Sequence, residues 1–407
     1  MPPTYRNFRS HVPWLILCLE AGFIALFYLL FSDYDAFRSS ISYPVFQDVN
    51  HMVIFGFGFF LTFLKRYGFS STGFNFLIIV LGVQCSMLTE GFVDFLLQRE
   101  QGDVLKSITS AAVSMTAVLI STGAVLGKAN PLQLILMAVV EVIFFHMSRW
   151  INTTFLQVPA NVSMMHVHLF GAYFGLAVSS CFSEPSPRSE KNASTLKSDL
   201  LSMLGTLFLW VFWPSFNSVF TVGGKRRAIY NTYFANAASA VTAFVLSALT
   251  TENGKFRMTH IRSAVLGGGI AVGYTAHSIE HPWIAMILGL LSSVIIILGS
   301  YCSQRCLNPA LKIHDTSGIH FSFGLPAMLG ALAQVVLLVI KNWTTSPRLG
   351  YLVMIHVAAF CQTISAALIT GFAAGLVLNL KPFKTIPVSK YFEDQLYWEF
   401  PHLAVGF

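Results

Sequence analysis

The 407-residue chain is strongly apolar, with 55% hydrophobic and only 11% charged residues. Soluble globular domains carry about 25% charged residues, and a mean hydropathy of +0.65 leaves no room for a large soluble domain. The net charge of +7 is typical of basic loops that flank membrane spans rather than of a nucleic-acid surface. We therefore expect one membrane domain over residues 1–407, in contact with the lipid bilayer, and no nucleic-acid partner.

Apolar runs long enough to cross a bilayer recur along the whole chain. No cleavage site of small residues follows the first run, so it is interpreted as a retained span and not as a signal peptide. In chain order the predicted spans are 13–31, 48–65, 72–92, 107–127, 131–149, 162–182, 199–220, 229–250, 259–276, 282–301, 318–340 and 352–380. The predicted fold class is all-α: a polytopic membrane protein of about twelve transmembrane helices.

The distribution of Lys and Arg indicates the orientation. With the N-terminus inside, the cytoplasmic segments hold 16 of these residues and the outer segments hold 9 of the 25 in all, as the positive-inside rule requires. The outer run Lys225-Arg226-Arg227 opposes this trend. An even number of spans places both termini in the cytoplasm, with residues 381–407 as a cytoplasmic tail.

Several ionisable residues fall at membrane depth, where each is a candidate functional group. They are Glu20, Glu90, Asp94, Glu141, His146, His166 and His168. Glu20 and Glu141 are expected to bond to a neighbouring helix rather than to a solute. Glu90 and Asp94 are either part of an outer vestibule or simply face water. His166 and His168 are two residues apart, so a helix points them in different directions and at most one lines a given pore.

The sequence contains none of the signatures of an enzyme or of a cofactor site. A phosphate-binding glycine loop, a zinc-binding HExxH motif and a nucleophile elbow are all missing, and the six cysteines form no pattern of a disulfide framework or zinc site. Glycines four residues apart, such as Gly171 and Gly175, predict close helix packing. Of two readings for Cys302 and Cys306, unmodified thiols are favoured over palmitoylation. The sequons are at Asn152, Asn161, Asn192 and Asn342. Asn192 is expected to face the cytoplasm and Asn161 to lie at a span edge, while Asn152 and Asn342 are outside but too close to the bilayer to predict a glycan.

Several long stretches resemble the Rh proteins, animal relatives of the ammonium transporters. They are residues 55–71 (FGFGFFLTFLKRYGFSS), 123–128 (GAVLGK), 170–176 (FGAYFGL) and 208–218 (FLWVFWPSFNS). The ending, residues 391–407 (YFEDQLYWEFPHLAVGF), is similar to that of the Rh blood-group D/CE polypeptides, the non-glycosylated erythroid members. The resemblance implies a trimer in which each helical subunit has its own pore, with an outer vestibule, two stacked Phe rings and two facing histidines.

Only part of that pore equipment is present in this chain. By the resemblance, Phe216 matches one gate phenylalanine and His168 matches the first pore histidine. Val113 stands at the other gate position, and Phe323 stands where the second histidine would be. Ala160 replaces an acid that conducting members carry eight residues before the first histidine. The sequence therefore predicts a channel fold with an impaired or closed ammonia path.

Two functional readings remain open. In the first, the chain is a structural subunit of a red-cell plasma-membrane complex, associated with the Rh-associated glycoprotein and, through its tail, with the ankyrin-linked skeleton. In the second, it is an active ammonia or carbon dioxide facilitator that works with one histidine. For the tail, which carries Trp398, Phe400 and Phe407, docking to a partner and packing against its own bundle are equally expected.

Overall fold

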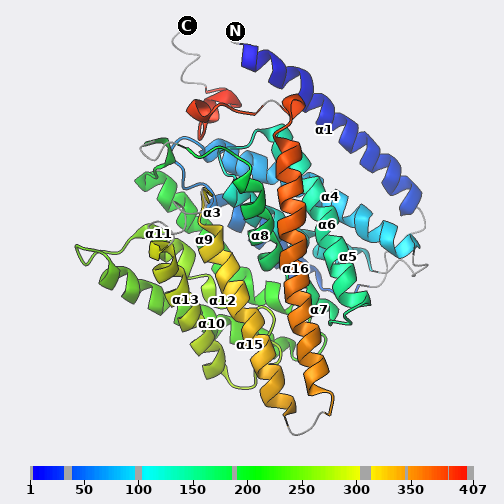
Figure 1. The fold of residues 1–407 in the computed structure, drawn as a ribbon, viewed down its shortest axis with the longest axis vertical. Helices are drawn as coiled ribbons and strands as arrows, with labels where there is room; N and C mark the ends of the chain where they lie inside the picture. The colour runs from blue at the N-terminus through cyan, green and yellow to red at the C-terminus, as the bar shows by residue number, and fades with distance from the viewer. Residues whose placement is uncertain are drawn as a thin grey trace.

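The computed structural model describes residues 3–31, 39–96, 103–185, 190–302, 313–343, 347–383 and 385–400. These residues form helices and turns, with no β-strand among them (Figure 1). Ten of the spans found in this part are long and apolar enough to cross a membrane. They are α1 (Pro3–Leu30), α4 (Gly68–Leu96), α5 (Val104–Ala124), α6 (Pro131–Thr154), α7 (Ala160–Met164) with α8 (Val167–Ser180), α9 (Leu196–Ser218), α10 (Lys225–Thr250), α13 (Pro282–Cys302), η4 (His320–Gly324) with α15 (Leu325–Asn342), and α16 (Leu349–Leu378).

The two remaining predicted spans are interrupted helices. Predicted span 48–65 is made of α2 (Tyr43–Asn50), the π-helical segment η1 (His51–Gly56) and α3 (Phe57–Phe60), and span 259–276 of α11 (Met258–Ala264) and α12 (Gly267–Ala271). Consecutive glycines disfavour a regular helix in the second case. They also permit close approach, because an ideal Cβ at Gly268 would overlap the carbonyl oxygen of Ala235. The all-α polytopic fold class is confirmed.

The helices pack through the small residues that the sequence singled out. An ideal Cβ at Gly171 would lie 2.7 Å from Ala117 Cα, and one at Gly175 would lie 2.6 Å from Ser121 Cα. These contacts join α8 to α5, and Gly371 brings α16 against the other side of α8. The predicted role of the glycines in close helix packing is confirmed, and α8 is enclosed by its neighbours.

Two of the intramembrane acids bond to neighbouring helices, as predicted. Glu20 on the peripheral helix α1 accepts a hydrogen bond from Gln84 Nε2 at 3.0 Å, which links α1 to α4. Glu141 on α6 accepts a hydrogen bond from Ser121 on α5. Helix α1 lies along the outer edge of the bundle (Figure 1), so this polar contact within an otherwise apolar surface helps to hold it there.

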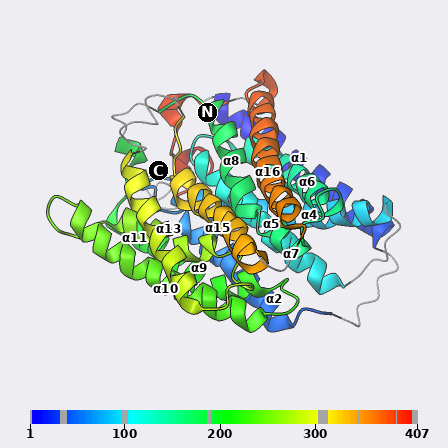
Figure 2. The same cartoon turned by 60° about the horizontal axis from the view of Figure 1, so that its bottom comes forward.

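The described part of the tail packs against its own bundle. Helix α1 begins and α16 ends at the same end of the molecule, where the tail also lies (Figures 1 and 2). The carboxylate of Asp394 accepts hydrogen bonds from the backbone N–H of Phe69 at 2.9 Å and of Ser70 at 2.8 Å, which caps the start of α4. The Trp398 indole N–H donates to Ser70 Oγ at 2.9 Å. Phe407 lies outside the described residues.

The sequons and cysteines are placed as follows. The Asn152 side chain is fully buried, and its Nδ2 donates to Thr363 Oγ1 at 3.1 Å, so folded Asn152 cannot carry a glycan. Cys18, Cys85, Cys181 and Cys361 are free thiols. Cys306 lies outside the described residues.

Candidate functional site

His166 and His168 diverge at a break in one span. Helix α7 ends at Met164 and α8 begins at Val167, with His166 in the turn between them. His166 Nδ1 lies 2.7 Å from Thr363 Oγ1, and its ring stacks on Phe360 at 5.0 Å, so it faces α16. His168 faces α9 instead. The prediction that the two rings point in different directions is confirmed.

The His168 ring is enclosed by aromatic side chains of α9. It stacks on Trp213 with a centroid distance of 5.7 Å and an angle of 17°, and it meets the edge of Phe216 at 5.8 Å. His168 is 1% exposed, and its Nδ1 lies 3.4 Å from the carbonyl oxygen of Met165. Its Nε2 is buried with no protein hydrogen-bond partner among the described residues. The structure thus brings the predicted pair Phe216 and His168 into contact and leaves one imidazole nitrogen without a hydrogen-bond partner among the described residues.

Phe323 belongs to a second aromatic cluster. It lies in the π-helical segment η4, is 1% exposed, and has its ring 5.9 Å from Phe57 and 6.0 Å from Phe60. The Phe57 and Phe60 rings also meet edge to face at 6.4 Å. Each pair lies within the range of favourable aromatic contact. Phe57, Phe60 and Phe323 therefore form a packed group, which we call the aromatic plug.

The plug and the His168 pocket are joined through α8. Segment η4 packs against α8, and an ideal Cβ at Gly324 would lie 3.4 Å from Ala172 Cβ. Ala172 is one helical turn after His168 on the same face. Phe323, the neighbour of Gly324, is therefore placed about one turn along α8 from His168, towards the C-terminal end of α8.

The two other predicted site residues differ in burial. Val113 is fully buried in α5. Gly171 of α8 lies against Ala117 of α5. One turn earlier in both helices, the same pairing places Val113 level with Val167, which precedes His168 in the chain. Ala160 is exposed at the start of α7, while its neighbour Asn161 lines a small cavity. Roles for Val113 and Ala160 in a pore stay predictions.

Two cavities adjoin the two aromatic clusters, and they are called outer and inner after the orientation predicted from the Lys and Arg distribution. On the outer side, Met165, Asn217, Phe220 and Tyr274 line a cavity that has no room for a water molecule. On the inner side, a cavity of about 570 Å³ is lined by residues that include Arg262, Asp315 and Ser322. Ser322 precedes Phe323 in the chain, and Arg262 lies 5.4 Å from the Phe60 ring centroid, so this inner cavity adjoins the aromatic plug.

The structure adds site residues that sequence reasoning did not single out. Phe57, Phe60 and Trp213 lie inside stretches 55–71 and 208–218, where the abundance of aromatic residues was the available signal. No sequence signal pointed to Arg262. In the structure its guanidinium carbon lies 4.0 Å from the ring centroid of Phe63 and 5.4 Å from that of Phe60. This buried cation fixes the plug from the side of the inner cavity through cation–π contacts.

Lys128, in the turn between α5 and α6, anchors the loop that lines the inner cavity. Its Nζ donates to Ser179 Oγ at 2.7 Å and to the carbonyl oxygen of His314 at 2.5 Å. Burial lowers the pKa of Lys128 from 10.5 to about 7, against the opposing effect of the Asp315 carboxylate. Asp315 in turn accepts hydrogen bonds from the backbone N–H of Gly318 and His320, both at 2.9 Å, at the start of η4.

The lowered pKa of Lys128 predicts a stability that depends on pH. Between pH 7 and 10.5 the unfolded chain holds a proton on Lys128 that the folded chain has released. The folded state therefore gains stability as the pH rises from 7 towards 10 and loses this contribution as the pH falls through that window. Melting temperatures of the detergent-solubilised chain at pH 7 to 10 measure the slope. Lys128→Met should flatten it, and an unchanged slope in this variant would contradict the assignment.

Comparison with known proteins agrees with this architecture. Residues 13–397 match the model of the Ammonium Transporter Family. The chain is 40% identical to the RH-like protein of Macaca mulatta over 412 residues, which cover 99% of both chains. It is also 40% identical to the Blood group Rh(CE) polypeptide of Homo sapiens, again over 99% of both. The solved structure of Rh50 from Nitrosomonas europaea superposes with a TM-score of 0.76 at 27% identity, covering 89% of this chain and 94% of that one. The chain therefore belongs to the ammonium transporter family and, within it, to the Rh proteins.

Proposed function

We propose that this chain is a structural Rh subunit that retains the channel fold but has a closed ammonia path. The observation that carries the proposal is the aromatic plug, in which Phe323 packs between Phe57 and Phe60 at the position expected for the second pore histidine. Phe323 offers neither a hydrogen-bond donor nor an acceptor, so a solute leaving His168 would meet a packed hydrocarbon surface.

The physical argument concerns both forms of the solute. Ammonium would lose its hydration in this region, and burying an unpaired ion is very costly. Neutral ammonia needs only a narrow opening and a few hydrogen-bonding groups, but the outer cavity has no room even for a water molecule. His168 is therefore left as the isolated remnant of a two-histidine path.

The proposed setting is a red-cell plasma membrane, in a trimer with Rh-family partners such as the Rh-associated glycoprotein. Likeness to the Rh blood-group polypeptide over 99% of both chains supports this setting. Loss of a solute path removes no helix-packing contact, so a silent subunit can still assemble. With both termini in the cytoplasm, the exposed tail residues Lys390 and Glu399 would be available to ankyrin-linked proteins.

One observation favours an alternative, an active ammonia or carbon dioxide facilitator. His168 Nε2 is buried, lacks a protein partner among the described residues, and lies on the side of the ring that Nδ1 does not use. A single available imidazole nitrogen could accept one hydrogen bond from ammonia during passage. This reading requires the aromatic plug to open.

Stopped-flow measurement of ammonia entry into liposomes distinguishes the two functions. We expect the purified chain to give the same rate as empty liposomes, and Phe323→His to raise the rate several-fold, because it restores an imidazole beside His168 and removes ring bulk. Phe321→His is the matched control, since it makes the same change two residues earlier and outside the plug.

Flux by the unmodified chain well above that of empty liposomes, abolished by His168→Ala, would overturn the closed-path proposal. Equal gains from Phe323→His and Phe321→His would mean that the plug is not the block.

A further inference from the structure

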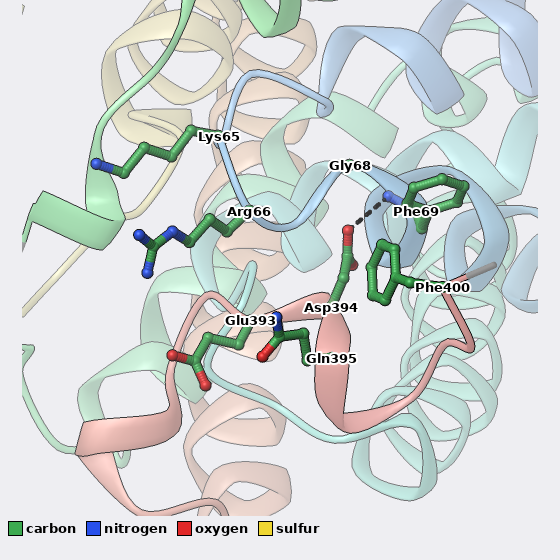
Figure 3. Close-up of a pocket in the computed structure, with 8 residues that line it drawn as sticks. All are labelled: Lys65, Arg66, Gly68, Phe69, Glu393, Asp394, Gln395 and Phe400. Carbon is green, nitrogen blue, oxygen red and sulfur yellow. Dashed lines mark hydrogen bonds between the residues drawn. The ribbon is translucent and has the colours of Figure 1, made fainter. Parts of the chain in front are cut away.

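A cavity of about 510 Å³ lies at the end of the bundle where α4 begins, and none of its lining residues lines the outer or the inner cavity. One wall is the turn before α4, with Lys65 and Arg66, and the first residues of α4, with Phe69. The other wall is the docked tail, with Glu393, Asp394 and Phe400 (Figure 3). In this view the two basic side chains extend on one side, and the rings of Phe69 and Phe400 lie together on the other. The cavity is thus charged at one end and apolar at the other.

The acidic groups of this cavity are already engaged. Asp394 accepts two hydrogen bonds from the backbone N–H groups of α4. Glu393 pairs with Lys191 at 2.5 Å and lies 3.9 Å from Lys390. Neither Lys65 nor Arg66 makes an ion pair with an acid in the part of the chain that the structure describes. The lining therefore carries equal numbers of basic and acidic side chains. Glu393 is offset by Lys191 and Lys390, which leaves Lys65 and Arg66 as cations without an ion pair among the described residues.

An apolar stripe runs from this cavity along the surface of α4. The exposed fractions are 60% for Phe69, 53% for Phe76 and 41% for Val80. A spacing of seven and then four residues puts the three side chains on one face of the helix. Because α4 is a candidate membrane span that begins at Gly68, this stripe faces lipid and Lys65 and Arg66 stand at the membrane boundary.

We propose that this cavity binds the phosphate headgroup of an anionic phospholipid. Lys65 and Arg66 contact the phosphate, and an acyl chain lies along Phe69, Phe76 and Val80. Basic residues next to a span are attracted to the anionic lipids of the cytoplasmic leaflet, which is the leaflet that the positive-inside rule assigns to this end of the bundle. A free phosphate would satisfy the two cations but would leave the apolar stripe unused, so the arrangement fits a lipid.

Native mass spectrometry of the full chain in detergent provides the test. Binding of dioctanoyl phosphatidylserine is compared with dioctanoyl phosphatidylcholine, with inorganic phosphate as competitor. We expect phosphatidylserine to bind more tightly, and the double variant K65Q/R66Q to weaken it about thirtyfold, since each basic side chain contributes separately to attraction at a membrane surface. The single variants Lys65→Gln and Arg66→Gln, each expected to lose about fivefold, serve if the double variant does not fold.

Two control variants separate the effect of net charge from that of the cavity. One has the same net charge as K65Q/R66Q but an unchanged cavity, and the other keeps both positive charges in the cavity. K225Q/R226Q removes two exposed cations at the start of another span and should leave phosphatidylserine binding unchanged. K65R/R66K keeps both charges and should retain binding. The proposal is overturned if the lipids bind equally, if K65Q/R66Q and K225Q/R226Q lose affinity equally, or if inorganic phosphate displaces phosphatidylserine at equal concentration.

Discussion

Gly205→Ala should prevent the chain from accumulating in a folded form. An ideal Cβ at Gly205 would clash with the backbone nitrogen of Phe60 and would lie 2.6 Å from the carbonyl oxygen of Gly56. These are backbone atoms of the broken helix that carries Phe57 and Phe60, so no rotamer change relieves the overlap. Overpacking of this kind costs about 3 kcal/mol or more when the backbone cannot move. Thermal unfolding of detergent-solubilised protein, with yield after size-exclusion chromatography, measures the loss.

Gly58→Ala is the matched control, because it makes the same substitution in the same broken helix. No atom lies within 4 Å of an ideal Cβ at Gly58. We expect the melting temperature of this variant to stay level or rise, since alanine favours a helix over glycine. A Gly205→Ala protein as stable as Gly58→Ala would mean that α9 does not approach α3 as closely as described.

Trp398→Ala should release the tail while leaving the membrane bundle folded. The Trp398 ring fills the space over Gly73, where Cζ2 would lie 2.5 Å from an ideal Cβ, and it packs 5.6 Å from Phe74. It also donates a hydrogen bond to Ser70. Trp398 is half-buried, so its truncation should cost about 2 kcal/mol, less than that of a fully buried tryptophan, which corresponds to roughly a thirtyfold rise in the detached population. Trypsin cleavage after Lys390 should accelerate accordingly.

Trp398→Phe retains most of the packing and loses only the indole N–H, so its cleavage rate should lie between those of the unmodified chain and Trp398→Ala. Glu399→Ala alters an exposed neighbour and should have no effect. If Trp398→Ala lowers the melting temperature of the whole bundle as much as it speeds cleavage, the tail is part of the cooperative core and not a docked segment.

Most of the fold is predictable from the sequence because apolar length is a local property. Each span appears as a run of residues that only a bilayer or a protein core can accommodate. The interruptions at η1 and η4 are not predictable in this way, since a π-helical segment depends on packing against other helices. The contact between Asp394 and Phe69 is not predictable either, because it joins residues 325 apart. The sequence is compatible both with a tail that packs against the bundle and with one that docks to a partner.

The site is predictable in part. Side-chain directions in a helix are enough to separate His166 from His168, and the resemblance pairs His168 with Phe216. It does not reveal that Phe323 meets Phe57 and Phe60, because those rings come from a different broken helix. Nor does it assign Trp213 to His168, since ring stacking at 5.7 Å requires the crossing of α8 and α9.

The buried Asn152 has a consequence for biosynthesis. Its hydrogen-bond partner Thr363 lies 211 residues downstream, so a ribosome must complete nearly the whole polypeptide before the amide is enclosed. In the orientation predicted from the Lys and Arg distribution, with the N-terminus in the cytoplasm, the sequon faces the lumen of the secretory pathway throughout that interval. Any chain that acquires an oligosaccharide there can no longer seat α16 against α6. A glycosylated fraction would therefore mark molecules diverted before their last span was inserted.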